Sequence, residues 1–161
     1  MMPNYKFRKA APQDLEGVYK IFSLADDQHR QAHPEIFQQT FDSKDAKEYL
    51  LSSIKSTDAV IFLAMNSSDI IGAILAWVRQ TPENSALLPI TYVSVEKLIV
   101  VENIRRQGVG KALMEHVHRW AKDRGIQQIQ LTVWDFNKSA QDFYNNLGYQ
   151  MLHQRMRKDL P

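Results

Sequence analysis

Apolar residues along the chain alternate between the two-residue spacing of strands and the 3.6-residue spacing of helices. The spacing predicts strands over residues 5–9, 59–65, 70–78, 90–101, 127–134 and 149–157. It predicts helices over residues 12–25, 43–54, 108–124 and 137–147. Residues 26–40 are mostly polar and are interpreted as a loop or a short pair of helices. The resulting order, β-α-α-β-β-β-α-β-α-β, predicts an α/β (α+β) fold with a mixed sheet and helices on both of its faces.

Length, charge and cysteine content narrow the class of protein. The 161 residues, of which 44% are hydrophobic, are enough for one domain (residues 1–161) with a substantial core. The formal charge is +2 and the basic residues are scattered, so a nucleic-acid partner is not expected. Cysteine is absent, which excludes disulfides, thiolate metal sites and a cysteine nucleophile and favours a cytoplasmic protein. Residues 1–6 lack the apolar core of an export leader, and no apolar run approaches the length of a membrane span, so neither is expected.

A glycine-rich turn lies between the predicted strand 90–101 and the predicted helix 108–124. Its sequence is Arg105-Arg106-Gln107-Gly108-Val109-Gly110-Lys111. Glycines let the backbone adopt positive φ and leave no Cβ in the way, so successive amide N–H groups can point at one anion. The following helix adds the positive end of its dipole. The turn is therefore predicted to hold a phosphate group.

Two better-known phosphate-binding motifs do not fit this turn. A P-loop requires glycine at position 105 and serine or threonine at position 112, where the chain has Arg105 and Ala112. A dinucleotide-binding motif that starts at Gly108 requires glycine or alanine at position 113, which is Leu113. The remaining pattern, Arg-x-x-Gly-x-Gly between a strand and a helix, resembles the acyl-CoA pyrophosphate loop of the GNAT superfamily of N-acetyltransferases.

A second segment, about thirty residues downstream, strengthens this resemblance. Residues 137–149 are similar to the family's motif Asn-x-x-Ala-x-x-Phe-Tyr-x-x-x-Gly-Phe/Tyr. Asn137 is the expected N-cap of the helix in this segment, and Gly148 is the expected residue just after its end. Four residues share one face of that helix: Ala140, Phe143, Tyr144 and Leu147. The resemblance is strong over residues 90–150 and loose before them.

The resemblance implies a mostly antiparallel sheet, acetyl-CoA as co-substrate, and transfer of the acetyl group to a primary amine. Backbone groups of the strand before the turn would hold the pantetheine arm, and the turn would hold the pyrophosphate. The cofactor-binding residues implied are Leu98, Ile99, Val100, Arg105, Arg106, Gln107, Gly108, Val109, Gly110, Lys111, Asn137, Ala140 and Phe143. A non-catalytic module that binds or senses acyl-CoA is the alternative. Family analogy also implies a homodimer through the C-terminal strand.

Two residues are candidates for the proton transfers. The resemblance gives Tyr144 the role of protonating the leaving thiolate. A free phenol has a pKa of about 10 and a free thiol one of about 8.5, so a tyrosine is protonated at neutral pH and close to the thiolate in basicity. Simple packing in the core is the alternative. An alkylammonium, with a pKa of about 10.4, needs a base or a desolvating site at neutral pH. Glu96 is the candidate base because it shares strand parity with Leu98. The alternatives are a solvated Glu96 carboxylate, an ion pair of Glu96 with Lys97 or Arg79, and a chain of water molecules as the base.

Four residues are candidates for lining the pocket of the amine acceptor: His29, His33, Phe37 and Trp77. The region between the first two helices commonly has this role in the superfamily. A metal site is not predicted, because neither His29 with His33 nor His116 with His118 has an evident third ligand. Small amines and peptide N-termini both remain candidate acceptors.

Overall fold

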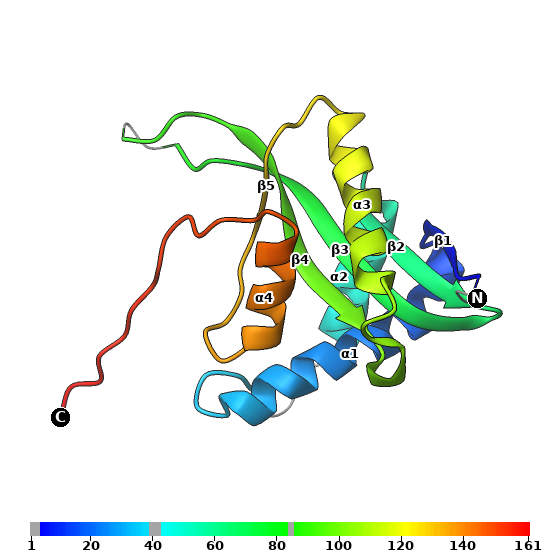
Figure 1. The fold of residues 1–161 in the computed structure, drawn as a ribbon, viewed down its shortest axis with the longest axis horizontal. Helices are drawn as coiled ribbons and strands as arrows, with labels where there is room; N and C mark the ends of the chain where they lie inside the picture. Colours follow the sequence, from blue (N-terminus) through cyan, green and yellow to red (C-terminus); the bar gives the residue numbers. More distant parts are fainter. Residues whose placement is uncertain (1–3, 39–42, 84–85) are drawn as a thin grey trace.

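The computed structural model describes residues 4–38, 43–83 and 86–161. Five strands form one sheet in the order β1-β2-β3-β4-β5, in which only β4 and β5 are parallel neighbours. Helices lie on both faces of this sheet (Figure 1), so the predicted mixed, mostly antiparallel architecture is confirmed. The elements are β1 Lys6–Lys9, a 3-10 turn η1 Pro12–Asp14, α1 Leu15–Ala32, α2 Ser43–Lys55, β2 Ala59–Asn66, β3 Asp69–Gln80, β4 Thr91–Val100, η2 Glu102–Ile104, α3 Val109–Lys122, β5 Ile129–Leu131 and α4 Lys138–Asn146.

Two apolar clusters, one on each face of the sheet, stabilise the fold. Successive residues of β3 point to opposite faces, so Ile74 packs in the cluster beneath α3 and Leu75 in the cluster beneath α1 and α2. Both side chains are fully buried. This burial on both faces explains why β2 and β3 are apolar without interruption instead of alternating with polar residues.

Helix α1 is longer than predicted. The apolar stripe suggested an end near Ala25, followed by a loop or a short pair of helices over residues 26–40, but the helix continues to Ala32. Residues 39 and 40 of that range lie outside the described residues. Neither glycine nor proline interrupts this stretch, and its polar residues stabilise the exposed turns, as in the ion pair between Arg30 and Asp27. The residue after the helix is His33, whose φ of −138° suits a residue that precedes proline.

The C-terminal segment contradicts the predicted strand 149–157. Residues 150–161 form no regular element and extend away from the body of the protein (Figure 1). Strand β5 is also shorter than the predicted 127–134 and pairs with β4 alone. A two-residue period produces a strand only where a neighbouring strand accepts its hydrogen bonds, and no other described strand lies beside β5. Met151, Met156 and Leu160 are therefore strongly exposed.

A β-bulge interrupts the pairing of β3 with β4. Leu75 pairs with Lys97 and Ala76 pairs with Val95, which leaves Glu96 as the additional residue on β4. Glu96 and Lys97 consequently point to the same face of the sheet, the one covered by α1 and α2. The bulge thus places two adjacent charged side chains together where a regular strand would separate them.

A close approach of α3 to the sheet makes Gly72 sensitive to substitution. A Cβ at Gly72 would lie 3.2 Å from the carbonyl oxygen of Ile99 and 3.2 Å from a methyl group of Leu113. We expect Gly72→Ala to lower the free energy of unfolding by about 1–3 kcal/mol, because the backbone oxygen has little room to move. Urea denaturation measures the change.

Gly17→Ala is the matched control for Gly72→Ala. Its Cβ would meet only the Ile70 side chain, with Cδ1 at 2.7 Å, and this end of a flexible side chain can rotate away. Alanine also has the higher helix propensity, so this variant should be at least as stable as the wild type. Equal destabilisation of the two variants would contradict the close-packing argument.

Candidate functional site

Strand β4 has an open edge beyond its pairing with β5. The parallel pairs run only from Val93 and Ile129 to Val95 and Leu131, whereas β4 continues to Val100. The chain then leaves β5 and continues through α4 (Figure 1). Residues 96–100 of β4 therefore have a strand neighbour on the β3 side only, in the part of the chain that the structure describes.

The main-chain groups of Leu98 and Val100 face this open edge. The N–H of Val101 donates to the carbonyl of Ile71 at the end of β3, and main-chain groups alternate sides along an antiparallel strand. Leu98 and Val100 thus point away from β3, and Arg105 Nε donates to the Val100 carbonyl over 3.0 Å. Ile99, by the same alternation, has its main-chain groups directed to β3. Of the three β4 residues predicted to bind the cofactor, Leu98 and Val100 therefore have main-chain groups at the open edge.

The glycine-rich turn has the conformation of an anion cradle. Gly108 has a φ of +81° and immediately precedes α3, and Arg106 has a φ of +65°. The first bond of the helix joins Ala112 N–H to the Gly108 carbonyl, so the amides of residues 109–111 have no acceptor within α3. Three successive N–H groups at a helix N-terminus are the arrangement that binds phosphate.

Polar contacts fix the turn to the rest of the protein. The Gln107 side chain accepts a hydrogen bond from the Tyr5 hydroxyl at 2.8 Å and donates to the Asn103 carbonyl at 3.3 Å. Gln107 thus anchors the turn, with its own amide N–H free to join the cradle. The side chains of Arg106 and Lys111 are exposed beside it. Tyr5 was missed by sequence reasoning, because the contact joins residues about a hundred positions apart.

Helix α4 brings the second motif against the cradle. Asn137 is its N-cap, since Asn137 Oδ1 accepts a hydrogen bond from the Ala140 N–H at 3.1 Å. Gly148 has a φ of +87° just after the helix, so both predicted helix ends are confirmed. The Phe143 ring lies 3.4 Å from the position that a Cβ at Gly110 would occupy. The two motifs, far apart in sequence, therefore meet at the N-terminus of α3.

Tyr144 lies in the aromatic cluster at the base of α4. Its ring makes edge contacts with Phe143, at 5.0 Å between centroids, and with Tyr149, at 5.7 Å. Burial, with a smaller contribution from Tyr149, raises the pKa of the Tyr144 hydroxyl well above its usual range. Tyr144 is therefore protonated at neutral pH. The Tyr144 hydroxyl can still donate a proton, although it is a weaker acid than a free phenol.

Glu96 has hydrogen-bond donors on both carboxylate oxygens. Arg79 Nη2 lies 2.5 Å from Glu96 Oε1, and the Tyr49 hydroxyl donates to Glu96 Oε2. The ion pair with Arg79, which was one alternative to a role of Glu96 as base, is thus present, whereas Lys97 pairs with Asp26 instead. The parity argument for Glu96 was wrong: the bulge turns Glu96 towards α2, while Leu98 packs in the α3 cluster.

Tyr49 completes this polar group. Burial, followed by its hydrogen bond to Glu96, raises the pKa of Tyr49 to about 12. Its ring stacks on Trp77 with 6.2 Å between centroids, and Arg79 lies 4.9 Å above the Trp77 ring. Sequence reasoning missed Tyr49, since nothing in the helical pattern of α2 distinguishes it from a packing residue.

The predicted acceptor residues divide between two places. His29, His33 and Phe37 come together at the end of α1, while Trp77 belongs to the group around Glu96. The first three contact rings of the segment between β5 and α4: Phe37 lies 5.0 Å from Trp134, and His33 lies 5.1 Å from Phe136.

We call the cluster of His29, His33, Phe37, Trp134 and Phe136 the ring clasp. Burial, opposed in part by Asp26, lowers the pKa of His29, so its imidazole is neutral at pH 7. Trp134 and Phe136 were missed, although aromatic residues just after a strand that runs parallel to its neighbour could have signalled a site.

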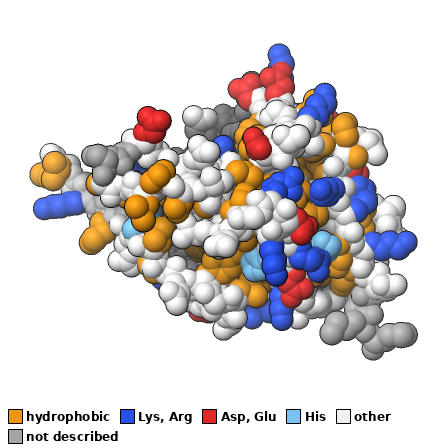
Figure 2. All heavy atoms as spheres, turned by 90° about the horizontal axis from the view of Figure 1, so that it is seen from above, with side chains coloured by type: hydrophobic (Ala, Val, Ile, Leu, Met, Phe, Trp, Pro, Cys, Tyr) orange, Lys and Arg blue, Asp and Glu red, His pale blue; other side chains and the backbone are white. Residues whose placement is uncertain are grey.

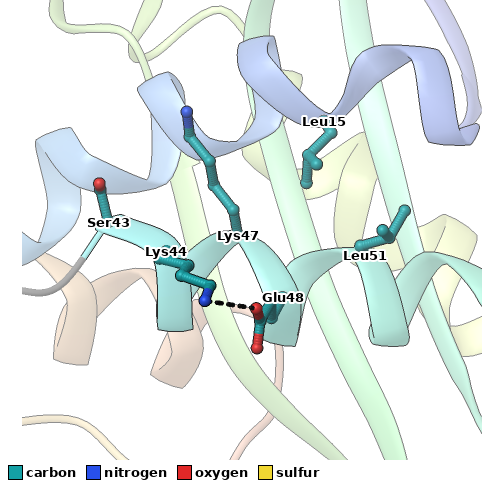
Figure 3. A pocket seen from close by; sticks show the side chains of 6 residues that line it. All are labelled: Leu15, Ser43, Lys44, Lys47, Glu48 and Leu51. Atoms are coloured by element: carbon teal, nitrogen blue, oxygen red, sulfur yellow. Dashed lines mark ion pairs between the residues drawn. The ribbon is translucent and has the colours of Figure 1, made fainter.

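A hollow between α1 and α2 is separate from the predicted site residues. It measures about 320 Å³ and is lined by Leu15, Ser43, Lys44, Lys47, Glu48 and Leu51 (Figure 3). Lys44 and Glu48 form an exposed ion pair across 3.9 Å at its rim. None of the predicted site residues lines this hollow, so it gives no support for a site there.

Within residues 4–38, 43–83 and 86–161, no three histidine, aspartate or glutamate side chains group as metal ligands would. No helix in those ranges is both long and apolar enough to cross a bilayer. On the face shown in Figure 2, basic side chains are interspersed with acidic ones.

Comparison with known proteins gives a family match and structural neighbours. The profile of the family described as "Acetyltransferase (GNAT) family" matches residues 18–149. Thialysine N-epsilon-acetyltransferase of Bos taurus is 40% identical over 58 residues, which are 36% of this chain and 34% of the bovine protein. The chain therefore matches about a third of the length of that relative.

Two solved structures resemble the whole chain. A mutant of the BH1408 protein from Bacillus halodurans superposes with a TM-score of 0.87 and 23% identity, over 97% of this chain and 99% of that one. The aminoglycoside N-acetyltransferase AAC(6')-Iy, solved in complex with CoA, superposes with a TM-score of 0.76 and 18% identity, over 98% and 95% of the two chains. These likenesses establish a shared fold.

Capping by Asn137 predicts a specific stability change. Asn137→Ala should lower the free energy of unfolding by about 1 kcal/mol, because the first turn of α4 loses its side-chain acceptor. Asn137→Asp retains an acceptor and should unfold at nearly the wild-type denaturant midpoint. The two variants and the wild type can be compared by urea denaturation. Identical midpoints for alanine and asparagine would show that the cap contributes nothing.

Proposed function

We propose, from the premise that the chain belongs to the acetyltransferase (GNAT) family, that it transfers the acetyl group of acetyl-CoA to a primary amine by direct attack in a ternary complex. One observation carries the proposal. The open edge of β4, the glycine-rich turn and the Phe143–Tyr144 segment meet at the N-terminus of α3. The proposal treats residues 1–161 as one N-acetyltransferase domain.

The geometry of the open edge supports acetyl-CoA as co-substrate. The pantetheine arm contains amide groups, which can pair with the main chain of Leu98 and Val100 as an added strand would. The amides of residues 107–111 and the side chains of Arg105, Arg106 and Lys111 would hold the pyrophosphate. Asn137 and Ala140 contribute indirectly, because they begin the helix that packs Phe143 against Gly110.

The proposed reaction breaks one bond and forms another. The amine nitrogen bonds to the acetyl carbonyl carbon, and the bond between that carbon and sulfur breaks. Tyr144 would supply a proton to the departing thiolate, as its protonated state allows. The proton that the amine loses passes to Glu96 or to a chain of water molecules. An N–H at the open edge of β4 would stabilise the oxyanion.

Relatives suggest the class of acceptor. AAC(6')-Iy is an aminoglycoside N-acetyltransferase, and the bovine relative is a thialysine acetyltransferase, so both act on amines. We propose a primary amine on a small molecule or at a peptide N-terminus as the acceptor here. His29, His33 and Phe37 are proposed to line its path together with Trp77, because the ring clasp and the Glu96 group lie on the α1 side of β4.

Two measurements on the wild type test the proposal. Isothermal titration calorimetry should detect acetyl-CoA binding, and a library of amines with free-thiol detection should show CoA release above the background rate. Binding without release for every amine would favour a non-catalytic acyl-CoA sensor instead. Absence of binding at millimolar acetyl-CoA, in folded protein, would falsify both functions.

The cradle predicts a selective effect of one glycine. Gly108→Ala places a Cβ on a residue with a φ of +81° and should strain the turn by about 1–2 kcal/mol. We expect acetyl-CoA affinity to fall about tenfold as the amide groups move out of alignment. Calorimetry measures the affinity, and denaturation measures the strain.

Gly125→Ala is the matched control for the cradle. Gly125 has a φ of +71°, a Cβ there also meets nothing within 4 Å, and the residue lies beyond the opposite end of α3. Both variants should therefore lose similar stability, while only Gly108→Ala should lose affinity. Equal affinities in the two variants would remove the turn from the binding site.

The role of Tyr144 predicts a rate effect. Tyr144→Phe should lower kcat about 100-fold or more with little change in acetyl-CoA affinity, because it removes the proton donor but keeps the ring. Tyr149→Phe removes a neighbouring hydroxyl that contacts His118 at 2.9 Å, and it should retain most of the activity. Steady-state kinetics with the best amine compares the two. A wild-type kcat for Tyr144→Phe would leave this tyrosine only its packing role.

We further propose that the enzyme works in the cytoplasm, without a nucleic-acid partner, and that it forms a homodimer. The support for the dimer is the exposed C-terminal segment, whose apolar side chains lack cover in the single chain. Sedimentation analysis of the full chain tests the oligomeric state, and cell fractionation tests the location.

A further inference from the structure

Glu96, Tyr49 and Trp77 form a cation-binding group that the protein's own Arg79 occupies. The guanidinium of Arg79 lies 2.5 Å from Glu96 Oε1 and 4.9 Å from the centre of the Trp77 ring. Tyr49 stacks on the same Trp77 ring and donates to the second oxygen of Glu96. A carboxylate beside an aromatic face is a general arrangement for binding organic cations.

The contacts that hold Arg79 in this group are open to solvent. Its contact with Glu96 is a single nitrogen–oxygen pair, and the side chains of Arg79 and Glu96 are 43% and 26% exposed. Tyr49 is 38% exposed, so the group opens to solvent on the α2 side. Ion pairs with this much solvent contact contribute little to stability, and they exchange readily with competing cations. A ligand cation therefore competes with a weakly held side chain.

The cation-binding group also lies beside the open edge of β4. Glu96 is the bulged residue of β4, immediately after Val95, which forms the last pair with β5. The bulge turns its carboxylate to the α1–α2 face, opposite the face on which Leu98 and Tyr144 pack against the core cluster beneath α3. A cation bound to Glu96 would thus lie next to the strand segment where β4 and β5 separate.

We infer that Arg79 is an exchangeable occupant of this group, and that the ammonium of a primary alkylamine acceptor displaces it from Glu96 and Trp77. Tyr49 stays in place during the exchange, because its hydroxyl keeps its proton and continues to donate to Glu96. The substrate role of the site rests on the proposed function; the cation binding itself does not.

The exchange would connect acceptor binding to the availability of a base. In the present arrangement both oxygens of Glu96 accept hydrogen bonds from protein donors. Departure of Arg79 frees Oε1 for the incoming ammonium, whose proton it can then accept. Glu96 would become available only when a cationic acceptor has entered.

Binding of a simple probe tests the site without coenzyme or turnover. Butylammonium chloride is titrated into ¹⁵N-labelled protein, with butanol as the uncharged control, and the indole N–H signals of the three tryptophans are followed. Trp77→Phe identifies the signal of Trp77. That signal should shift with butylammonium but not with butanol, while the signal of the buried Trp120 should stay in place.

Substitution of Arg79 gives the decisive comparison. In Arg79→Gln the affinity for butylammonium should rise about three- to fivefold, because the competing cation is gone. Arg79→Lys keeps a competing cation and should stay near the wild-type affinity. Lys97→Gln is the matched control: it removes an equal charge from the neighbouring ion pair with Asp26, so it should not raise the affinity.

Several results would overturn the inference. Equal shifts with butylammonium and butanol would mean that charge is not recognised. Equal affinities of Arg79→Gln and wild type would mean that Arg79 does not compete. A rise of the same size in Lys97→Gln would mean that only the general electrostatic field changed. Thermal unfolding of each variant confirms that it is folded during the titration.

Kinetics with the best amine extends the test to the acceptor. KM for that amine should fall in Arg79→Gln in proportion to the butylammonium result, and it should not fall in Lys97→Gln. If no amine is acetylated by the wild type but the probe results hold, the proposed function fails and the cation site stands. If amines are acetylated but Arg79→Gln has a wild-type or higher KM, the inference fails and the proposed function stands.

Discussion

The site depends on the point at which parallel pairing of β4 with β5 stops. Beyond Val95 and Leu131 the two strands separate, and the remaining half of β4 has hydrogen-bonding groups that no strand in the described part of the chain satisfies. Unpaired main-chain donors and acceptors need another partner, which is either water or a ligand with amide groups of its own. The N-terminus of α3, the start of α4 and the end of α1 are all arranged around this one gap in the ladder.

Local sequence signals predicted most of the fold. Apolar spacing located nearly every element, Asn137 and Gly148 marked both ends of α4, and the glycine spacing located the cradle before α3. These features depend on residues close together in the chain, so they can be predicted from a short stretch of sequence. The end of α1 was misplaced because polarity was taken as a loop signal, although no residue before Pro34 actually disrupts the helix.

Features that depend on distant residues could not be predicted in the same way. The bulge at Glu96 arises from the register between two strands, and it reverses the face that simple parity assigns to that carboxylate. Tyr49 reaches the site from α2, Tyr5 from just before β1, and Trp134 from the segment after β5, and only the folded sheet brings these segments together. The missing C-terminal strand has the same origin, since a strand requires a neighbour that the sequence alone does not reveal.

The extended C-terminal segment also has a chemical consequence. Met151 and Met156 are 72% and 91% exposed, whereas Met65 and Met114 in the core are 8% and 0% exposed. Thioether oxidation depends on access by the oxidant, and sulfoxide formation converts an apolar side chain into a polar one. Peroxide would therefore modify the tail while the sheet is still intact, and the loss of apolar character would appear first in whatever contacts the tail makes with other molecules.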